Sequence, residues 1–133
     1  MIVLCYAVYI PLRLFTAIRR VETGGERDPE NAVGDGGASI GPYQIMWAYW
    51  FDAQQYDPSL TNNGNTYQNC KGAGSYQYSR RVIQAYMNRY AIPSRLGHTA
   101  TNEDIARIHN GGPNGYNNPN ILVYWEKVKK HLQ

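Results

Sequence analysis

Two carboxylates in this sequence are spaced so that they could perform acid–base chemistry together. Glu22 falls in the last turn of an expected helix, and Asp35 follows thirteen residues later inside a Gly-Asp-Gly-Gly run. A carboxyl group at a helix C-terminus faces the negative end of the dipole and meets no free N–H groups, which favours its protonated form. A protonated Glu opposite a second carboxylate is the pair that cleavage of a glycosidic bond requires.

Each carboxylate taken alone has a simpler interpretation. A single glutamate is most often solvated at the surface. An aspartate beside glycines is common in turns, because it tolerates such backbone and bonds its own chain. Only the two together carry the hypothesis, in which Glu22 is the general acid and Asp35 is the nucleophile or the base that activates water.

Five further residues are candidates for binding a sugar substrate. Tyr43 and Gln44 follow the glycine-rich segment, and a phenol and an amide can bind N-acetyl and hydroxyl groups. His109, Asn110 and Gly111 lie where an expected helix enters a Gly-rich loop, which lets the backbone approach a polymer closely. A lone histidine is as often structural, so His109 is expected either to contact the sugar or to position other groups.

Periodicity and capping signals predict the elements that position these residues. Apolar spacing, helix-start residues and Gly or Pro stops predict helices over residues 12–23, 76–91, 101–110 and 121–133, with Thr101 or Asn102 capping the third of these. Residues 42–53 suit a short buried helix or a strand, and a helix is favoured. Residues 26–41 predict a small irregular β-hairpin and residues 57–75 a loop. The aromatic side chains of Trp47, Tyr49 and Trp50 are expected in the core. The expected fold class is α+β and mostly α-helical.

Length and composition favour one compact domain over residues 1–133. The chain has 133 residues, of which 43% are hydrophobic and 17% charged, so disordered and collagen-like classes are excluded. Residues 1–66 hold four arginines against seven acids, whereas residues 67–133 hold nine bases against three acids. A basic second half suits a polyanionic polymer as target. Nucleic acid is not expected as a partner, because the sequence has neither a Lys/Arg run nor a nucleic-acid-binding motif.

The two cysteines and the apolar start of the chain give weaker signals. Cys5 and Cys70 form at most one disulfide, and their spacing matches no metal site, so neither a metal nor another cofactor is expected. Residues 1–10 are too short to span a membrane and lack the basic start of a signal peptide. They form either a buried strand or helix that leads into the domain, or the remnant of an export signal. The expected form is a monomer with no membrane partner.

Several strings occur in the order that one protein family uses. VETGG, GDGGASIGPYQI, AYW, AYMNRYA and ARIHNGGPNG, spread over roughly residues 14–130, resemble the invertebrate-type lysozymes, also called the destabilase family. ARIHNGGPNG is the most specific of these strings. The resemblance implies a lysozyme-like fold and hydrolysis of the β-1,4 bond between N-acetylmuramic acid and N-acetylglucosamine in peptidoglycan, with chitooligosaccharide as a related substrate. It also implies Glu22 as general acid and a secreted, extracellular protein.

The sequence departs from the family pattern at three points. Members are usually rich in disulfides, whereas this chain has two cysteines. The position of the family's catalytic Asp is occupied by Gly34, and Asp35 instead matches the goose-type lysozyme arrangement, in which an Asp stands thirteen residues after the Glu. Some members carry isopeptidase activity through a Ser–Lys pair; Ser39 lies near the serine's place, but Met46 stands close to the lysine's.

Two other functions remain compatible with these residues. In a lytic transglycosylase the sugar's own C6 hydroxyl attacks, so no second carboxylate is needed. A catalytically silent glycan-binding protein would keep the cleft without the chemistry.

Overall fold

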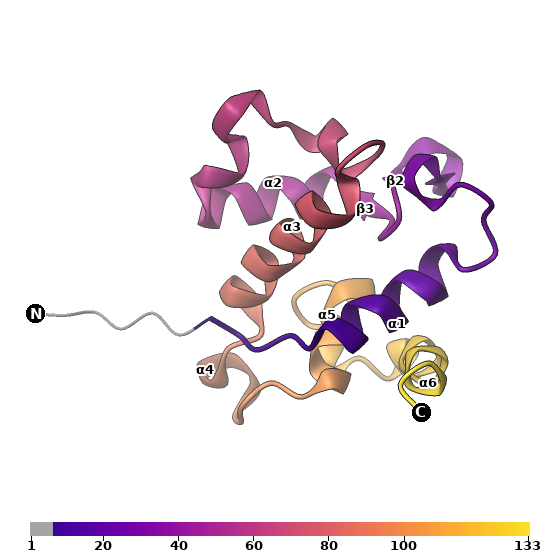
Figure 1. Ribbon diagram of the computed structural model, residues 1–133. Helices are drawn as coiled ribbons and strands as arrows, with labels where there is room; N and C mark the ends of the chain where they lie inside the picture. Colours follow the sequence, from indigo (N-terminus) through magenta and orange to yellow (C-terminus); the bar gives the residue numbers. More distant parts are fainter. Residues whose placement is uncertain (1–6) are drawn as a thin grey trace, which may run out of the picture.

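The computed structural model describes residues 7–133, so Cys5 and most of the apolar first segment lie outside it. Helix α3 (Ser75–Tyr90) is the longest element, and it packs against α2 (Trp47–Tyr56) and against α5 (Asn102–Gly111) (Figure 1). Helix α6 (Leu122–Lys130) contacts both α5 and α1 (Leu12–Thr23). The fold is therefore mostly helical, as the sequence predicts.

Helix α1 begins and ends where the sequence signals place it. Pro11 precedes its first turn and Gly24 follows its last residue. Leu14 and Ile18 are fully buried, which confirms the apolar stripe of the predicted helix. The last turn of α1 therefore carries Glu22 to the edge of the small sheet.

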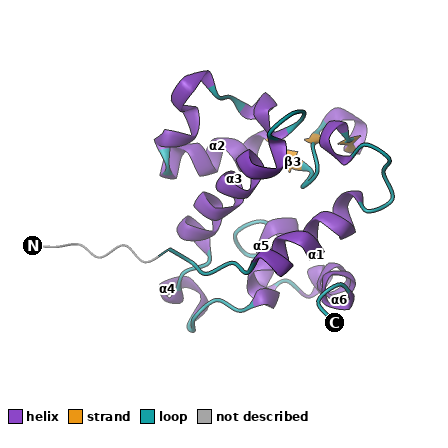
Figure 2. Ribbon diagram, in the orientation of Figure 1, coloured by secondary structure: helices purple, strands orange, loops and turns teal. Residues whose placement is uncertain are grey.

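The predicted hairpin is present, and a third strand extends it. Strands β1 (Val33–Gly34), β2 (Ser39–Ile40) and β3 (Ile45–Met46) form an antiparallel sheet in that order (Figure 2). The helix predicted over residues 42–53 is wrong in its first half, because α2 begins only at Trp47. Ile45 pairs with Ile40, and the positive φ of 52° at Gln44 is incompatible with a helix there.

The rest of the chain follows the predicted order with added short elements. The predicted loop over residues 57–75 contains 3₁₀ segments at Pro58–Gly64 and Tyr67–Cys70. A short helix α4 (Pro93–Leu96) follows α3. Thr101 caps α5 through a capping box with Asp104, a role the sequence assigned to Thr101 or Asn102.

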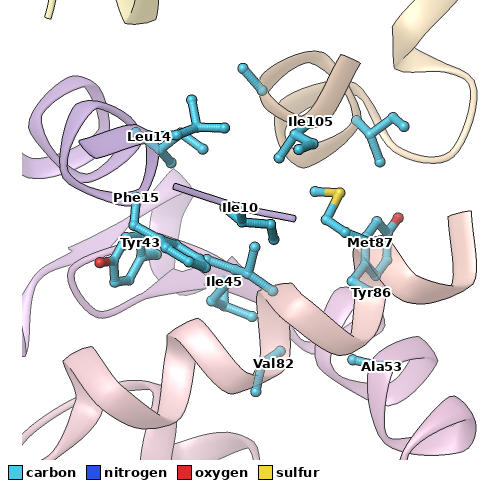
Figure 3. Packing of buried hydrophobic residues seen from close by; sticks show 14 of the residues in the cluster. Ile10, Leu14, Phe15, Tyr43, Ile45, Ala53, Val82, Tyr86, Met87 and Ile105 are labelled. Carbon is cyan, nitrogen blue, oxygen red and sulfur yellow. The ribbon is translucent and has the colours of Figure 1, made fainter. Parts of the chain in front are cut away.

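One apolar core joins the helices to the sheet. Leu14 and Phe15 of α1 point into the same interior as Met87 of α3 and Ile105 of α5 (Figure 3). Ile10 closes this interior from the segment before α1. Residues 7–10 form neither helix nor strand, so the predicted regular lead-in is wrong where it can be described.

The aromatic residues of α2 divide between the core and the surface. Trp50 is partly buried and donates its indole N–H to the Tyr78 hydroxyl at 2.9 Å. Tyr49 stacks on Tyr86 with ring centroids 3.8 Å apart. Trp47, in contrast, is 54% exposed, so the expectation that it packs in the core is wrong.

The structure also bears on the expectation of at most one disulfide and on the question of a membrane span. Cys70 is fully buried and forms no disulfide with another cysteine of residues 7–133. Burial raises the pKa of its thiol to about 12. None of the helices between residues 7 and 133 has the length and apolar character that a membrane span requires.

The turn at Gly41 generates a stability prediction. Gly41 has a φ of 77°, and a Cβ there would collide with the backbone oxygen of Cys70. We expect Gly41→Ala to lower the free energy of unfolding by at least ~2 kcal/mol, because it adds backbone strain to a collision with main chain. Urea unfolding followed by circular dichroism measures the loss.

Gly25→Ala is the matched control for Gly41→Ala. No heavy atom lies within 4 Å of a Cβ at Gly25, so its stability should change by less than about 0.5 kcal/mol. Equal stability of the two variants would contradict the role assigned to Gly41.

Candidate active site

A cleft of about 310 Å³ opens between the end of α1, the sheet, the first half of α2 and the end of α5. Three carboxylates face it, from Glu22, Asp35 and Asp52. Its remaining lining residues are Ser39, Gln44, Met46, Ala48, Tyr49, Tyr86, His109, Asn110 and Gly112. Segments far apart in the sequence thus contribute to one concave site.

Glu22 is the most strongly perturbed acid of the cleft. Its side chain is only 19% exposed, and burial raises the pKa of its carboxyl to about 7. The Tyr124 hydroxyl donates a hydrogen bond of 2.9 Å to Glu22 Oε2, which lowers this pKa, while the negative charge of Asp35 raises it. Glu22 therefore keeps a substantial protonated fraction at neutral pH, as a general acid requires.

Asp35 stands at the turn between β1 and β2, in a backbone conformation that few residues adopt. Its φ is 51°, a region in which Asp and Asn are tolerated better than most residues. The Ser39 hydroxyl donates to Asp35 Oδ2 at 2.7 Å, which fixes the orientation of the carboxyl group toward the cleft.

Gly34 lies in close contact with the side chain of Gln44. A Cβ at Gly34 would collide with the side-chain oxygen of Gln44, so a larger residue there would require this side chain to move. The Gln44 amide donates to the Gly41 oxygen at 2.9 Å. Asp35 lines the cleft, whereas Gly34 does not.

His109 is a buried neutral group behind Glu22. Its Nε2 lies 3.2 Å from the Tyr43 carbonyl oxygen, and its Nδ1 lies 3.1 Å from the Tyr49 hydroxyl. A carbonyl only accepts, so Nε2 carries the proton and Nδ1 accepts from Tyr49. Burial lowers the pKa of His109 to about 4, so its 3.8 Å approach to Glu22 Oε2 is not an ion pair at neutral pH.

The structure brings most of the predicted site residues together. Glu22, Asp35, Gln44, His109 and Asn110 all line the same cleft. Gly112 lines it in place of the predicted Gly111. At Gly111 a Cβ would meet the Ile121 side chain, so this glycine allows close packing between the end of α5 and the segment before α6.

Tyr43 is placed differently from the sequence prediction. Its side chain is only 2% exposed and packs edge-on against Phe15 and Tyr76 in the core. It is absent from the cleft lining, and only its carbonyl oxygen reaches the site, through His109. The spacing of residues along the sequence does not reveal this inward placement.

Sequence reasoning missed several residues of the site. Tyr124 lies on α6 and contacts Glu22 across 102 residues of sequence, a contact that no local sequence pattern reveals. Asp52 lines the cleft and accepts from Arg89 at 3.1 Å. Tyr49 lines the cleft as well as packing on Tyr86.

Two alternative chemistries find no support among the described residues. Within residues 7–133 no group of three or more His, Cys, Asp or Glu side chains is arranged to hold a metal ion. The residues lining the described cleft include Ser39 and Met46 but no lysine, so a Ser–Lys pair is not formed there.

Comparison with known proteins shows which family the chain belongs to. The family model described as Destabilase matches residues 15–131. The chain is 41% identical over 91 residues to "Lysozyme 1" of Crassostrea virginica and 36% identical over 91 residues to the lysozyme of Ostrea edulis. These matches cover 68% of the chain but only 44% and 58% of the two relatives, so the chain spans about half their length.

Solved structures extend the likeness over nearly the whole chain. The crystal structure of Meretrix lusoria lysozyme in complex with Aeromonas hydrophila PliI is matched with a TM-score of 0.71 and 28% identity, over 94% of this chain and 93% of that one. The Tapes japonica lysozyme structure is matched with a TM-score of 0.63 and 30% identity, over 90% and 89% of the two chains. With its ordered sequence motifs and its lysozyme-like fold, the chain belongs to the destabilase family of invertebrate-type lysozymes.

Proposed function

We propose that this protein is a lysozyme-type glycoside hydrolase that cleaves the β-1,4 bond between N-acetylmuramic acid and N-acetylglucosamine in peptidoglycan. The observation that carries the proposal is the buried Glu22, whose pKa of about 7 and place in one cleft with Asp35 suit a general acid with a second carboxylate. The likeness to proteins named lysozyme supports the substrate class.

In this mechanism Glu22 donates its proton to the glycosidic oxygen as the bond breaks. Asp35 acts on the other side of the sugar ring, either as nucleophile or as the base that activates water. Once Glu22 has lost its proton, its partly buried carboxylate favours taking one back, which readies it for the next step. The amides of Gln44 and Asn110 face the same cleft and are suited to bind N-acetyl and hydroxyl groups.

The basic second half of the chain favours a negatively charged polymer such as peptidoglycan. We also propose that the protein is secreted, on the family resemblance. A tagged full-length chain expressed in its own cell type should then be recovered from the medium, and retention inside the cells would oppose this location.

The first activity prediction concerns the two carboxylates. Glu22→Gln should reduce the clearing of a peptidoglycan suspension by at least about 10²-fold, because no other proton donor of the cleft replaces it. Asp35→Asn should also lower the rate strongly. Glu26→Gln is the control, because Glu26 is an exposed glutamate four residues after Glu22. This variant should clear the suspension at the parent rate.

The products distinguish this reaction from its nearest alternative. Mass spectrometry of the released muropeptides should show the reducing sugar ends that hydrolysis produces, whereas 1,6-anhydro ends would indicate a lytic transglycosylase. Full activity in Glu22→Gln would reject the mechanism. Binding of peptidoglycan without any turnover by the parent protein would favour a silent glycan-binding protein.

The second activity prediction concerns pH. Because Glu22 must be protonated to act, kcat/KM should fall as the pH rises through about 7. Tyr124→Phe removes the hydrogen bond that lowers the pKa of Glu22, so this alkaline limb should move to higher pH. Tyr116→Phe is the control, since its hydroxyl donates to the Arg95 carbonyl. A limb that stays in place in Tyr124→Phe would show that Tyr124 does not act on Glu22.

The raised pKa of Glu22 also makes the free energy of unfolding depend on pH. The pKa of Glu22 is about 7 in the folded protein and 4.5 for an unperturbed glutamate, so between these pH values the folded state holds a proton that the unfolded chain has released. The free energy of unfolding of the parent should therefore fall as the pH rises across this window. Glu22→Gln lacks this titration and should be more stable than the parent by roughly 1–3 kcal/mol at pH 8.

The stability difference should vanish below about pH 4.5, where Glu22 is protonated in both states. Urea unfolding at pH 4 and pH 8 measures it, with Glu26→Gln alongside. A difference that is the same at both pH values would mean that burial does not perturb Glu22.

A further inference from the structure

An exposed aromatic pair borders the cleft on α2. Trp47 is 54% exposed and Phe51 is 37% exposed, and their rings stack with centroids 4.8 Å apart and planes 20° from parallel. Large exposed aromatic side chains that lie together commonly mark a binding surface. Neither residue lines the cleft itself, so the mechanism above does not use them.

The pair is continuous with the cleft through its sequence neighbours. Met46 and Ala48 both line the cleft, and Trp47 stands between them. On α2, Ala48 and Asp52 form the row that faces the cleft, and Trp47 and Phe51 form the adjacent row, one residue earlier at each turn. A ligand that leaves the cleft over Met46 and Ala48 therefore passes directly onto this pair.

The cleft is too small to enclose a whole glycan strand. At about 310 Å³ the cleft is at the small end of the roughly 300–1,000 Å³ range of ligand pockets, so it encloses only a short stretch of a glycan. The rest of the strand must continue over the surrounding surface. A surface of charged side chains alone would offer no contact to the apolar C–H face of a pyranose ring.

The stacked pair supplies such a contact in a pre-organised form. Phe51 covers one face of the Trp47 ring and restricts its rotamers, so little conformational entropy is lost when a ligand binds the other side. Trp47 is more than half exposed, so its indole N–H is open to a sugar hydroxyl.

We propose that Trp47 and Phe51 form an additional sugar-binding platform, on which a β-1,4-linked glycan strand of N-acetylated sugars continues beyond the cleft. This inference rests on the proposed glycosidase function and extends it to the length of substrate that the protein binds. Trp47 contacts the sugar, and Phe51 is a positioning residue that holds the Trp47 ring.

The test compares a long and a short probe on an inactive background. Calorimetry with the Glu22→Gln protein measures the binding of the hexamer and of the trimer of N-acetylglucosamine. Trp47→Ala in this background should weaken binding of the hexamer about tenfold, the size of one aromatic stacking contact, and should leave the trimer unchanged. Phe51→Ala should cause a smaller loss, and Trp47→Phe should retain most of the affinity.

Tyr9→Ala is the matched control, because Tyr9 is an aromatic residue that is 80% exposed and lies outside the cleft lining. In the active protein, Trp47→Ala should raise KM for long chains while kcat stays near the parent value. Circular dichroism should show that every variant is folded, as expected for substitutions at exposed positions.

Four outcomes would overturn the platform. Hexamer binding that is equal in Trp47→Ala and its parent would remove it while leaving the glycosidase function intact. An equal loss for hexamer and trimer would place Trp47 inside the cleft rather than beyond it. Concentration-dependent dimerisation in sedimentation velocity that Trp47→Ala abolishes would make the pair an interface between two copies. Failure of the parent to bind either probe or to clear peptidoglycan would reject the glycosidase function and the platform with it.

Discussion

The desolvation of one carboxyl group is the constraint on which the rest of this structure depends. Glu22 ends α1 and is covered by Tyr124 from α6 and approached by His109 from α5. Burying an ionised carboxylate without a cationic partner is costly, so the group keeps its proton to higher pH. Within residues 7–133 the basic side chain in ion-pair range of Glu22 is that of His109, and burial keeps it neutral.

The residues around Glu22 keep its pKa high while they hold its carboxyl group in place. A lysine or a charged histidine in the place of His109 would stabilise the ionised form of Glu22. Glu22 would then lose its proton at lower pH and could not act as a general acid. His109 instead uses its N–H on the Tyr43 carbonyl and its other nitrogen on the Tyr49 hydroxyl. The single hydrogen bond from Tyr124 orients the carboxyl group while lowering its pKa only in part. The site is thus held by neutral groups that are themselves well bonded.

The small sheet brings a second carboxylate, that of Asp35, to the cleft that Glu22 lines. Three strands of two residues each are too short to be stable alone, and they are held by the core residues Ile40 and Ile45. Positive φ values at Asp35 and Gln44 show that backbone strain is concentrated in this segment. Asp35 lines the cleft from this segment, with its carboxyl group held by the Ser39 hydroxyl.

The sequence by itself determined the helices with clear periodicity and caps, the hairpin, and the placement of Glu22 in the last turn of α1. These follow from local rules, because hydrogen bonds and side-chain contacts within a helix join residues close in sequence. Only the tertiary structure decided that Tyr43 packs in the core, that β3 precedes α2, that Trp47 is exposed, and that Tyr124 reaches Glu22. Each of these depends on contacts between segments distant in sequence, and the pKa of Glu22 depends on burial, which no spacing of residues along the chain encodes.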